Sequence, residues 1–181
     1  MTGFSNRILY GVNPKFPKLI LQSLTEQVKD LTYEKSLTHG NVENSIRTST
    51  QCWLAWDTWI AGIMHNLFIS ANNAYFHYAL DHFDSAIQAT KYGVGQEYKW
   101  HVDDAVNTNK LPRKLSMSLV LDSEFEGGEL EIMTPTTKSI SQNIKPGNIC
   151  IFPSWVPHRV KPVTSGTRYS LVAWMNGPQF I

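Results

Sequence analysis

The sequence predicts a single, mainly β domain in which N-terminal helices support a β-sandwich or jelly roll. Two observations lead to this fold class. Apolar residues recur at helical spacing up to about residue 72, and from Ala74 onward short apolar runs alternate with Gly, Pro, Asn and Asp. The 181 residues contain no internal repeat, low-complexity tract or linker. We therefore expect one domain over residues 1–181, with helical support over about 15–72 and a jelly-roll core over about 74–176.

The first expected elements are two helices. Pro17 fits the first turn of a helix over residues 17–31, where a missing N–H is tolerated, and apolar residues follow at Ile20, Leu24, Val28 and Leu31. The side-chain oxygens of residues 48–50 suit the N-cap of a second helix, which ends at Asn72 and Asn73. Its apolar residues recur every three or four positions, which predicts a stripe facing the core: Trp53, Trp56, Ile60, Ile63 and Leu67.

The remaining expected elements are short strands separated by turns. The candidate strands are residues 75–80, 85–92, 98–103, 115–121, 129–133, 139–144, 148–152, 158–163 and 167–175. Gly127-Gly128 and residues 145–148 have the composition of turns.

Composition excludes several classes of partner. Sixteen basic and fifteen acidic residues leave a net charge of +1, and no run of Lys or Arg favours nucleic acid. The N-terminus lacks the apolar stretch of about 7 to 15 residues that a signal peptide needs. Residues 59–71, the most apolar segment, fall short of the roughly 20 residues that span a bilayer. We expect a soluble, cytoplasmic protein with reduced thiols at Cys52 and Cys150 and no membrane partner, and the oligomeric state stays open.

His101, Asp103 and His158 are the candidate metal ligands. Residues two apart on a strand project to the same face, so His101 and Asp103 can reach one ion. Such a pair is often only a surface feature, but here His158 follows a proline-bracketed loop, residues 152–157, and opens the next expected strand. Two histidines and one carboxylate form the ligand set that holds non-heme Fe(II) and leaves open positions for chemistry.

Arg168 is the candidate anion-binding residue. Alternation along residues 167–175 places Arg168, Ser170, Val172 and Trp174 on one face of the last strand. A guanidinium on a buried face needs an anion. That anion is either an internal Asp or Glu, or a ligand carboxylate bound with help from the hydroxyls of Ser170 and Tyr92.

The stretch from Tyr92 to Met175 resembles the catalytic core of the 2-oxoglutarate and Fe(II)-dependent dioxygenases, in the prolyl 4-hydroxylase-like branch that includes PKHD-type hydroxylases. The matching segments are YGVGQEYKWHVD (92–103), FEGGEL (125–130) and IFPSWVPHRVKPVTSGTRYSLVAW (151–174). The resemblance implies a double-stranded β-helix, which is a jelly roll, with supporting N-terminal helices.

The resemblance also implies roles for single residues. It assigns His101, Asp103 and His158 to iron and Arg168 to the distal carboxylate of 2-oxoglutarate. Tyr92 and Ser170 would assist at the cosubstrate, whereas Tyr98 and Trp174 look like pocket walls or ordinary core aromatics.

The implied activity is hydroxylation of an unactivated C–H bond, with conversion of 2-oxoglutarate and dioxygen to succinate and carbon dioxide and with ascorbate as a supporting reductant. The implied substrate is a prolyl residue of a peptide or protein. A free amino acid, another small molecule, or a cupin-like metal-binding module without turnover are the alternatives. Asp103 disfavours halogenation, Trp174 disfavours repair of alkylated bases, and a zinc hydrolase is disfavoured because no HExxH-type element supplies a general base.

Two further expectations concern the substrate. Residues 104–113 are polar and form either a mobile lid or an ordinary solvated loop. Arg47, Trp100 and Trp155 are candidates for a peptide groove, although packing or surface exposure is the more common setting for each.

Overall fold

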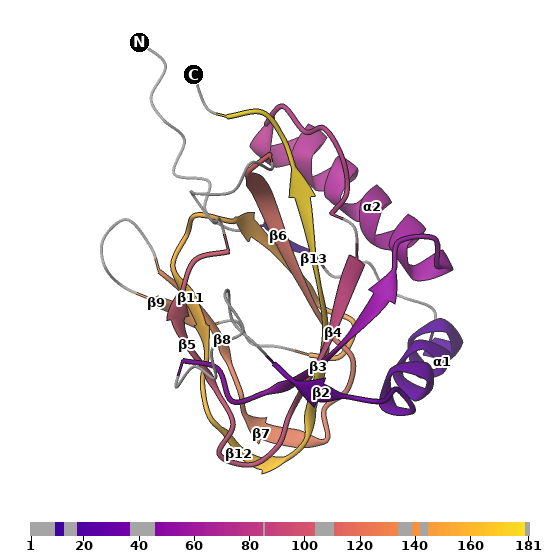
Figure 1. Cartoon of the computed structure of the whole chain (residues 1–181), viewed down its shortest axis with the longest axis vertical. Helices are drawn as coiled ribbons and strands as arrows, with labels where there is room; N and C mark the ends of the chain where they lie inside the picture. The colour runs from indigo at the N-terminus through magenta and orange to yellow at the C-terminus, as the bar shows by residue number, and fades with distance from the viewer. Residues whose placement is uncertain are drawn as a thin grey trace.

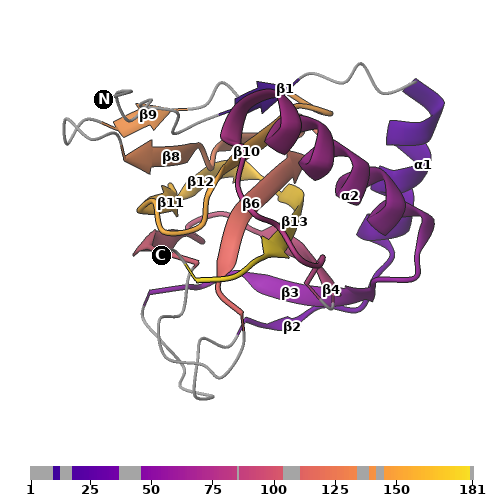
Figure 2. The same ribbon diagram turned by 90° about the horizontal axis from the view of Figure 1, so that it is seen from above.

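The structure is a computed structural model that describes residues 10–12, 18–36, 46–84, 86–103, 111–133, 139–141 and 145–179. Its centre consists of two β-sheets that face each other, and two α-helices cover the outer face of the larger sheet (Figure 1). Figure 2 shows the same layers from above, with α1 and α2 on one side and the small sheet on the other. The predicted mainly β fold with N-terminal helices is confirmed.

The larger sheet has seven strands, and every neighbouring pair is antiparallel. Its order is β1 (Tyr10–Val12), β10 (Ile149–Pro153), β6 (Arg113–Val120), β13 (Arg168–Asn176), β4 (Ala86–Tyr92), β3 (Thr50–Ala55) and β2 (Glu34–Lys35). The smaller sheet has the order β5 (Tyr98–His101), β11 (His158–Val160), β8 (Leu130–Met133) and β9 (Ser139–Ser141). A two-stranded ribbon pairs β12 (Val163–Gly166) with β7 (Phe125–Gly127).

The two faces of the larger sheet pack against different clusters of apolar side chains. Helices α1 (Lys18–Lys29) and α2 (Trp59–Ala71) pack apolar side chains such as Val28 and Phe68 against its outer face. Leu171 and Ala173 of β13 belong to this core, as their alternation predicts. The inner side of the same strand carries Arg168, Ser170 and Trp174. A second apolar cluster lies there between the sheets and consists of Tyr92, Leu130, Ile132, Cys150, Phe152, Val156, Val160 and Val163.

The start of the second helix was predicted wrongly. Residues 50–55 form strand β3, which pairs along its whole length with β4, and the helix begins only at Trp59. Trp53 and Trp56 are 48% and 67% exposed, so the aromatic stripe does not face the core. Pairing with β4 satisfies the backbone of this segment, and this long-range interaction outweighs the helical spacing of its tryptophans.

The predicted strand over residues 75–80 is also wrong. A π-helical turn, η1 (Asn72–Phe76), continues from α2. The Asn72 side-chain amide then binds the backbone of Tyr78 twice, donating to its carbonyl at 2.9 Å and accepting from its N–H at 2.9 Å. These two bonds mimic backbone pairing and hold the segment in an irregular path.

The other predicted strands are confirmed with shifted ends. The strand that was expected to reach Asp103 ends at His101, and the strand expected over residues 158–163 ends at Val160, before a separate strand, β12, begins at Val163. Strands β1, β2, β3, β7 and β12 were not predicted. Residues 142–144, the end of another expected strand, lie outside the described residues, and the single domain over residues 1–181 stays a prediction. None of the described helices is long and apolar enough to cross a membrane.

Candidate metal centre and its cavity

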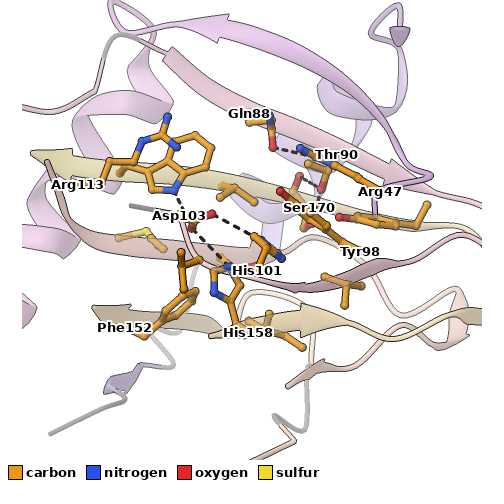
Figure 3. A pocket seen from close by; sticks show the side chains of 18 of the residues that line it. Arg47, Gln88, Thr90, Tyr98, His101, Asp103, Arg113, Phe152, His158 and Ser170 are labelled. Atoms are coloured by element: carbon orange, nitrogen blue, oxygen red, sulfur yellow. Dashed lines mark hydrogen bonds and ion pairs between the residues drawn. The ribbon is translucent and has the colours of Figure 1, made fainter. Parts of the chain in front are cut away.

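The three predicted ligands come together at the pairing of β5 with β11. The register of these strands sets His101 directly opposite His158. Asp103 lies just beyond the end of β5, where its N–H donates to the Ser154 carbonyl at 2.9 Å. One donor atom from each ligand lies within 4.8 Å of the others. The carboxylate faces both imidazoles, with its oxygens 3.6 Å from His101 Nε2 and 3.5 Å from His158 Nε2 (Figure 3).

Backbone carbonyls orient both imidazoles. His101 Nδ1 lies 2.8 Å from the Lys99 carbonyl, and His158 Nδ1 lies 2.9 Å from the Val156 carbonyl. A carbonyl only accepts, so each Nδ1 carries the proton and each Nε2 lone pair faces the centre. Burial, helped by the nearby His158, lowers the pKa of His101 to about 4. His101 is therefore neutral at pH 7, which is the form that binds a metal.

Hydrogen bonds hold one of the two carboxylate oxygens of Asp103. Its Oδ2 accepts from Ser116 Oγ at 2.7 Å and from Trp174 Nε1 at 2.9 Å, and the Ser116 hydroxyl also lies 2.9 Å from that of Ser154. Burial raises the pKa of Asp103, but the two neighbouring imidazoles and these hydrogen bonds lower it more, so the net pKa lies below its usual value. An ionised carboxylate with two imidazole Nε2 atoms is a suitable donor set for a divalent transition metal.

Aromatic rings pack against both imidazoles. The Tyr98 ring stacks on His101 with centroids 3.4 Å apart, and Phe152 meets His158 edge-on at 4.7 Å. Burial raises the pKa of Tyr98 to about 12, so the phenol stays protonated at neutral pH. The rings restrict both histidines to one orientation.

Arg168 is buried beside this centre and is incompletely paired. It lies opposite Tyr92 in the register of β13 with β4 and is 1% exposed. Its Nη1 donates to Ser170 Oγ at 2.6 Å, whereas Nε and Nη2 have no partner among the described residues. Burial lowers the pKa of Arg168, and the negative charge of Asp122 partly offsets this, but that carboxylate pairs with Lys29 at 3.0 Å. Of the two anions considered from the sequence, a ligand carboxylate therefore suits Arg168 better than an internal one.

One cavity of about 480 Å³ joins the metal centre to Arg168. All eight residues singled out from the sequence line it: His101, Asp103, His158, Arg168, Tyr92, Ser170, Tyr98 and Trp174. Arg47, a candidate for the peptide groove, lines it as well. Trp100 and Trp155 do not; Trp100 packs against Arg159 at 4.9 Å and Trp155 against Tyr78 at 5.5 Å.

Several lining residues were missed by the sequence reasoning. Thr90 shares a face of β4 with Tyr92, and its hydroxyl lies 2.7 Å from that of Ser170, so strand alternation was a usable signal. Arg113 packs over Trp174 at 3.9 Å and pairs with Asp84 at 2.9 Å, an arrangement for which the sequence holds no local signal. Of the candidate lid, residues 104–110 lie outside the described residues.

Residues 87–176, about half of the chain, match the 2OG-Fe(II) oxygenase superfamily. This match contains every residue of the candidate site named from the sequence, and the chain belongs to this superfamily. Its sequence relatives include PKHD-type hydroxylases. It is 35% identical over 92 residues to one from Synechococcus sp. (strain CC9605), covering 50% of this chain and 41% of the relative. It is 40% identical over 88 residues to one from Hyphomonas neptunium, covering 46% of this chain and 39% of the relative. The alignments thus span about two fifths of the length of these curated relatives.

Solved structures extend the similarity to nearly the whole chain. A Pseudomonas putida prolyl-4-hydroxylase has a TM-score of 0.78 at 18% identity, covering 96% of this chain and 94% of that one. A Trichoplax adhaerens prolyl hydroxylase, solved with a peptide fragment of the hypoxia inducible factor oxygen degradation domain, has a TM-score of 0.79 at 19% identity, covering 94% and 84%. At these identities the similarity concerns the fold, and it confirms the predicted jelly roll.

Proposed function

We propose that this chain is a 2-oxoglutarate and Fe(II)-dependent dioxygenase that hydroxylates an unactivated C–H bond, with a prolyl residue of a peptide or protein as its substrate. One observation carries the proposal. The buried guanidinium of Arg168 has two nitrogens that no described residue pairs, and it lies in the same cavity as a two-histidine, one-carboxylate group. A metal-binding module without turnover has no use for such a cation beside its metal.

The metal would be held by His101, Asp103 and His158. Each imidazole offers its Nε2, because Nδ1 is occupied by a backbone carbonyl, and Asp103 offers the oxygen that Ser116 and Trp174 leave free. Three protein ligands leave positions open for a cosubstrate and dioxygen.

The cosubstrate would be held by Arg168. Its free nitrogens suit the distal carboxylate of 2-oxoglutarate, and Tyr92 and Ser170 would add hydroxyl contacts. When bound, Fe(II) and 2-oxoglutarate supply the oxidising power: dioxygen and 2-oxoglutarate are consumed, and succinate, carbon dioxide and the hydroxylated product are formed. The walls formed by Tyr98 and Trp174 would exclude water and position the substrate.

The substrate class is supported by the relatives. The similar proteins include PKHD-type hydroxylases and prolyl hydroxylases, one of them solved with a peptide. A cavity of about 480 Å³ also suits a free amino acid or another small molecule, which is the alternative that a substrate screen tests. Ascorbate is expected to support turnover by keeping the iron reduced.

The first test is an anaerobic titration of the metal-free protein with Fe(II) and then with 2-oxoglutarate, followed through the visible charge-transfer band of the chelate. We expect the band in the wild type and in Arg159→Met, which removes an arginine that contacts Glu131 outside the cavity. We expect the band to require far more 2-oxoglutarate in Arg168→Met. Iron binding without any band in the wild type would overturn the proposal and favour the binding-module alternative.

A further inference from the structure

The cavity holds an excess of positive charge. Among its described lining residues there are three arginines, Arg47, Arg113 and Arg168, but only one carboxylate, that of Asp103. Arg113 is neutralised from outside the cavity by Asp84, at 2.9 Å. The counterion of Arg168 is the distal carboxylate of the proposed cosubstrate. Arg47 is the cation for which the proposed function supplies no counterion.

Neutral groups hold the Arg47 guanidinium in place. Its Nε donates to Ser49 Oγ at 2.8 Å, and its Nη2 donates to Gln88 Oε1 at 2.9 Å. Gln88 is itself fixed, because its Nε2 donates to Gln51 Oε1 at 2.8 Å. Arg47 makes no ion pair within the part of the chain that the structure describes, and its Nη1 has no hydrogen-bond partner there. The described residues therefore position the guanidinium without neutralising it, as expected of a binding group.

Arg47 also lies close to the metal centre. Its backbone forms a bridge with Tyr98, and the flanking segment is tied to β5 by the Lys99 N–H, which donates to the Ile46 carbonyl at 2.8 Å. The guanidinium carbon lies 4.8 Å from the centroid of the Tyr98 ring, which stacks on His101 (Figure 3). Only one ring separates the cation from a metal ligand, so a group bound to Arg47 lies near the reacting carbon.

With metal and cosubstrate bound, the charges of the site other than Arg47 and the Arg113–Asp84 pair would sum to zero. A divalent metal and Arg168 bring three positive charges, and Asp103 with the dianionic cosubstrate brings three negative charges. We propose that the primary substrate carries a carboxylate near the carbon that is hydroxylated and that Arg47 binds this carboxylate. The inference rests on the proposed function and narrows its substrate class. The carboxylate is either an acidic side chain next to the target residue of a peptide or the α-carboxylate of a free amino acid.

Two pairs of probes distinguish these sources. The first pair is a capped, proline-containing peptide with Glu or with Gln beside the proline. The second pair is free L-proline and L-prolinamide. Binding is measured by calorimetry on protein loaded with Mn(II) and 2-oxoglutarate without oxygen, so that the readout does not depend on turnover. Succinate release with Fe(II) and oxygen is measured in parallel.

The expected result is that the wild type binds the carboxylate member of one pair at least about 10-fold more tightly than the neutral member, because a charge-assisted contact is lost in the latter. Arg47→Gln should abolish this preference. Lys99→Gln, which removes the same charge from an exposed position on β5 outside the cavity, should keep it. The pair that shows the preference identifies the source of the carboxylate.

Three outcomes would overturn the inference: equal affinity for both members of each pair, a preference that survives in Arg47→Gln, or no binding of either carboxylate probe to the loaded protein. The failure of the proposed function is distinguishable from all three. It would be seen as the absence of the charge-transfer band, before any substrate is added.

Discussion

Replacing Arg168 by Met should make the ligand-free protein more stable while removing its response to 2-oxoglutarate. Arg168 is one of the largest fully buried side chains, and among the residues that the structure describes it has one hydrogen bond and two nitrogens without a partner. Burial also lowers its pKa from the usual value, because the charged form loses hydration. Met has a similar length and no polar atoms, so the variant fills the same space without burying a charge.

The magnitude follows from these contacts. A buried, unsatisfied polar group costs about 1–3 kcal/mol, and replacing buried charges by apolar groups of similar volume often stabilises a protein by about 1–4 kcal/mol. We therefore expect Arg168→Met to raise the free energy of unfolding of the ligand-free protein by about 1–4 kcal/mol. With 2-oxoglutarate at about 100 times Kd, the wild type gains about 2.7 kcal/mol, and the variant should gain almost none.

The assay is urea unfolding followed by tryptophan fluorescence, first on the metal-free protein, then with Mn(II) alone and then with Mn(II) and 2-oxoglutarate, so that the gain from 2-oxoglutarate is the difference between the last two. Arg159→Met is the matched control, because Arg159 donates to the largely buried Glu131 at 2.6 Å and its loss leaves that carboxylate unpaired. The control should be less stable than the wild type and should keep the response to 2-oxoglutarate. A ligand-free Arg168→Met protein less stable than the wild type would refute the reasoning, because the guanidinium would then already have its anion.

Three further predictions concern the same cavity. Ser116→Ala removes a hydrogen bond to the carboxylate ligand and should weaken Mn(II) binding about 10- to 100-fold in calorimetry; unchanged affinity would exclude an orienting role. A Cβ on Gly128 would lie 2.9 Å from Arg168 Cδ, whereas one on Gly95 meets nothing within 4 Å although φ is positive at both. Gly128→Ala should therefore weaken 2-oxoglutarate binding and Gly95→Ala should not. Equal losses of 2-oxoglutarate affinity in both variants would show that backbone strain alone causes the effect. Because the pKa of His101 falls from 6.5 in the unfolded chain to about 4 in the folded one, the unfolded state binds more protons below pH 6.5. The metal-free protein should lose about 2 kcal/mol of stability between pH 7 and pH 5, and urea unfolding of His101→Gln should show a correspondingly smaller loss; an equal loss would contradict the assignment.

The residues of the site were predictable where local patterns determine them. Alternation along β13 correctly separated Arg168 and Ser170 from Leu171, because one face of that strand meets the helices and the other lines the cavity. The spacing of His101 and Asp103 also predicted that their side chains lie close enough to share one ion, and their donor atoms lie within 4.8 Å of each other although the strand ends at His101. These predictions required only the two-residue period of a strand and the donor chemistry of the side chains.

Long-range pairing explains what could not be predicted. The tryptophans of residues 53–59 fit a helix by spacing, and only the partner strand β4 makes residues 50–55 a strand. The same strand pairing places Gln88 opposite Trp53 and within reach of Arg47, forty-one residues earlier in the chain. A contact of this kind leaves no local pattern in the sequence.

The site depends on both sheets, and Asp103 is one of the residues that join them. The two histidines belong to paired strands of the smaller sheet, whereas Arg168 belongs to the larger one. Asp103 follows a strand of the smaller sheet, but its carboxylate is held by Ser116 of β6 and by the indole of β13, both in the larger sheet. A metal bound to all three ligands would therefore tie the two sheets together, and a cosubstrate reaching Arg168 would tie them again. It follows that Mn(II) and 2-oxoglutarate should protect the backbone amides of both sheets from hydrogen exchange, not only those of β5 and β11.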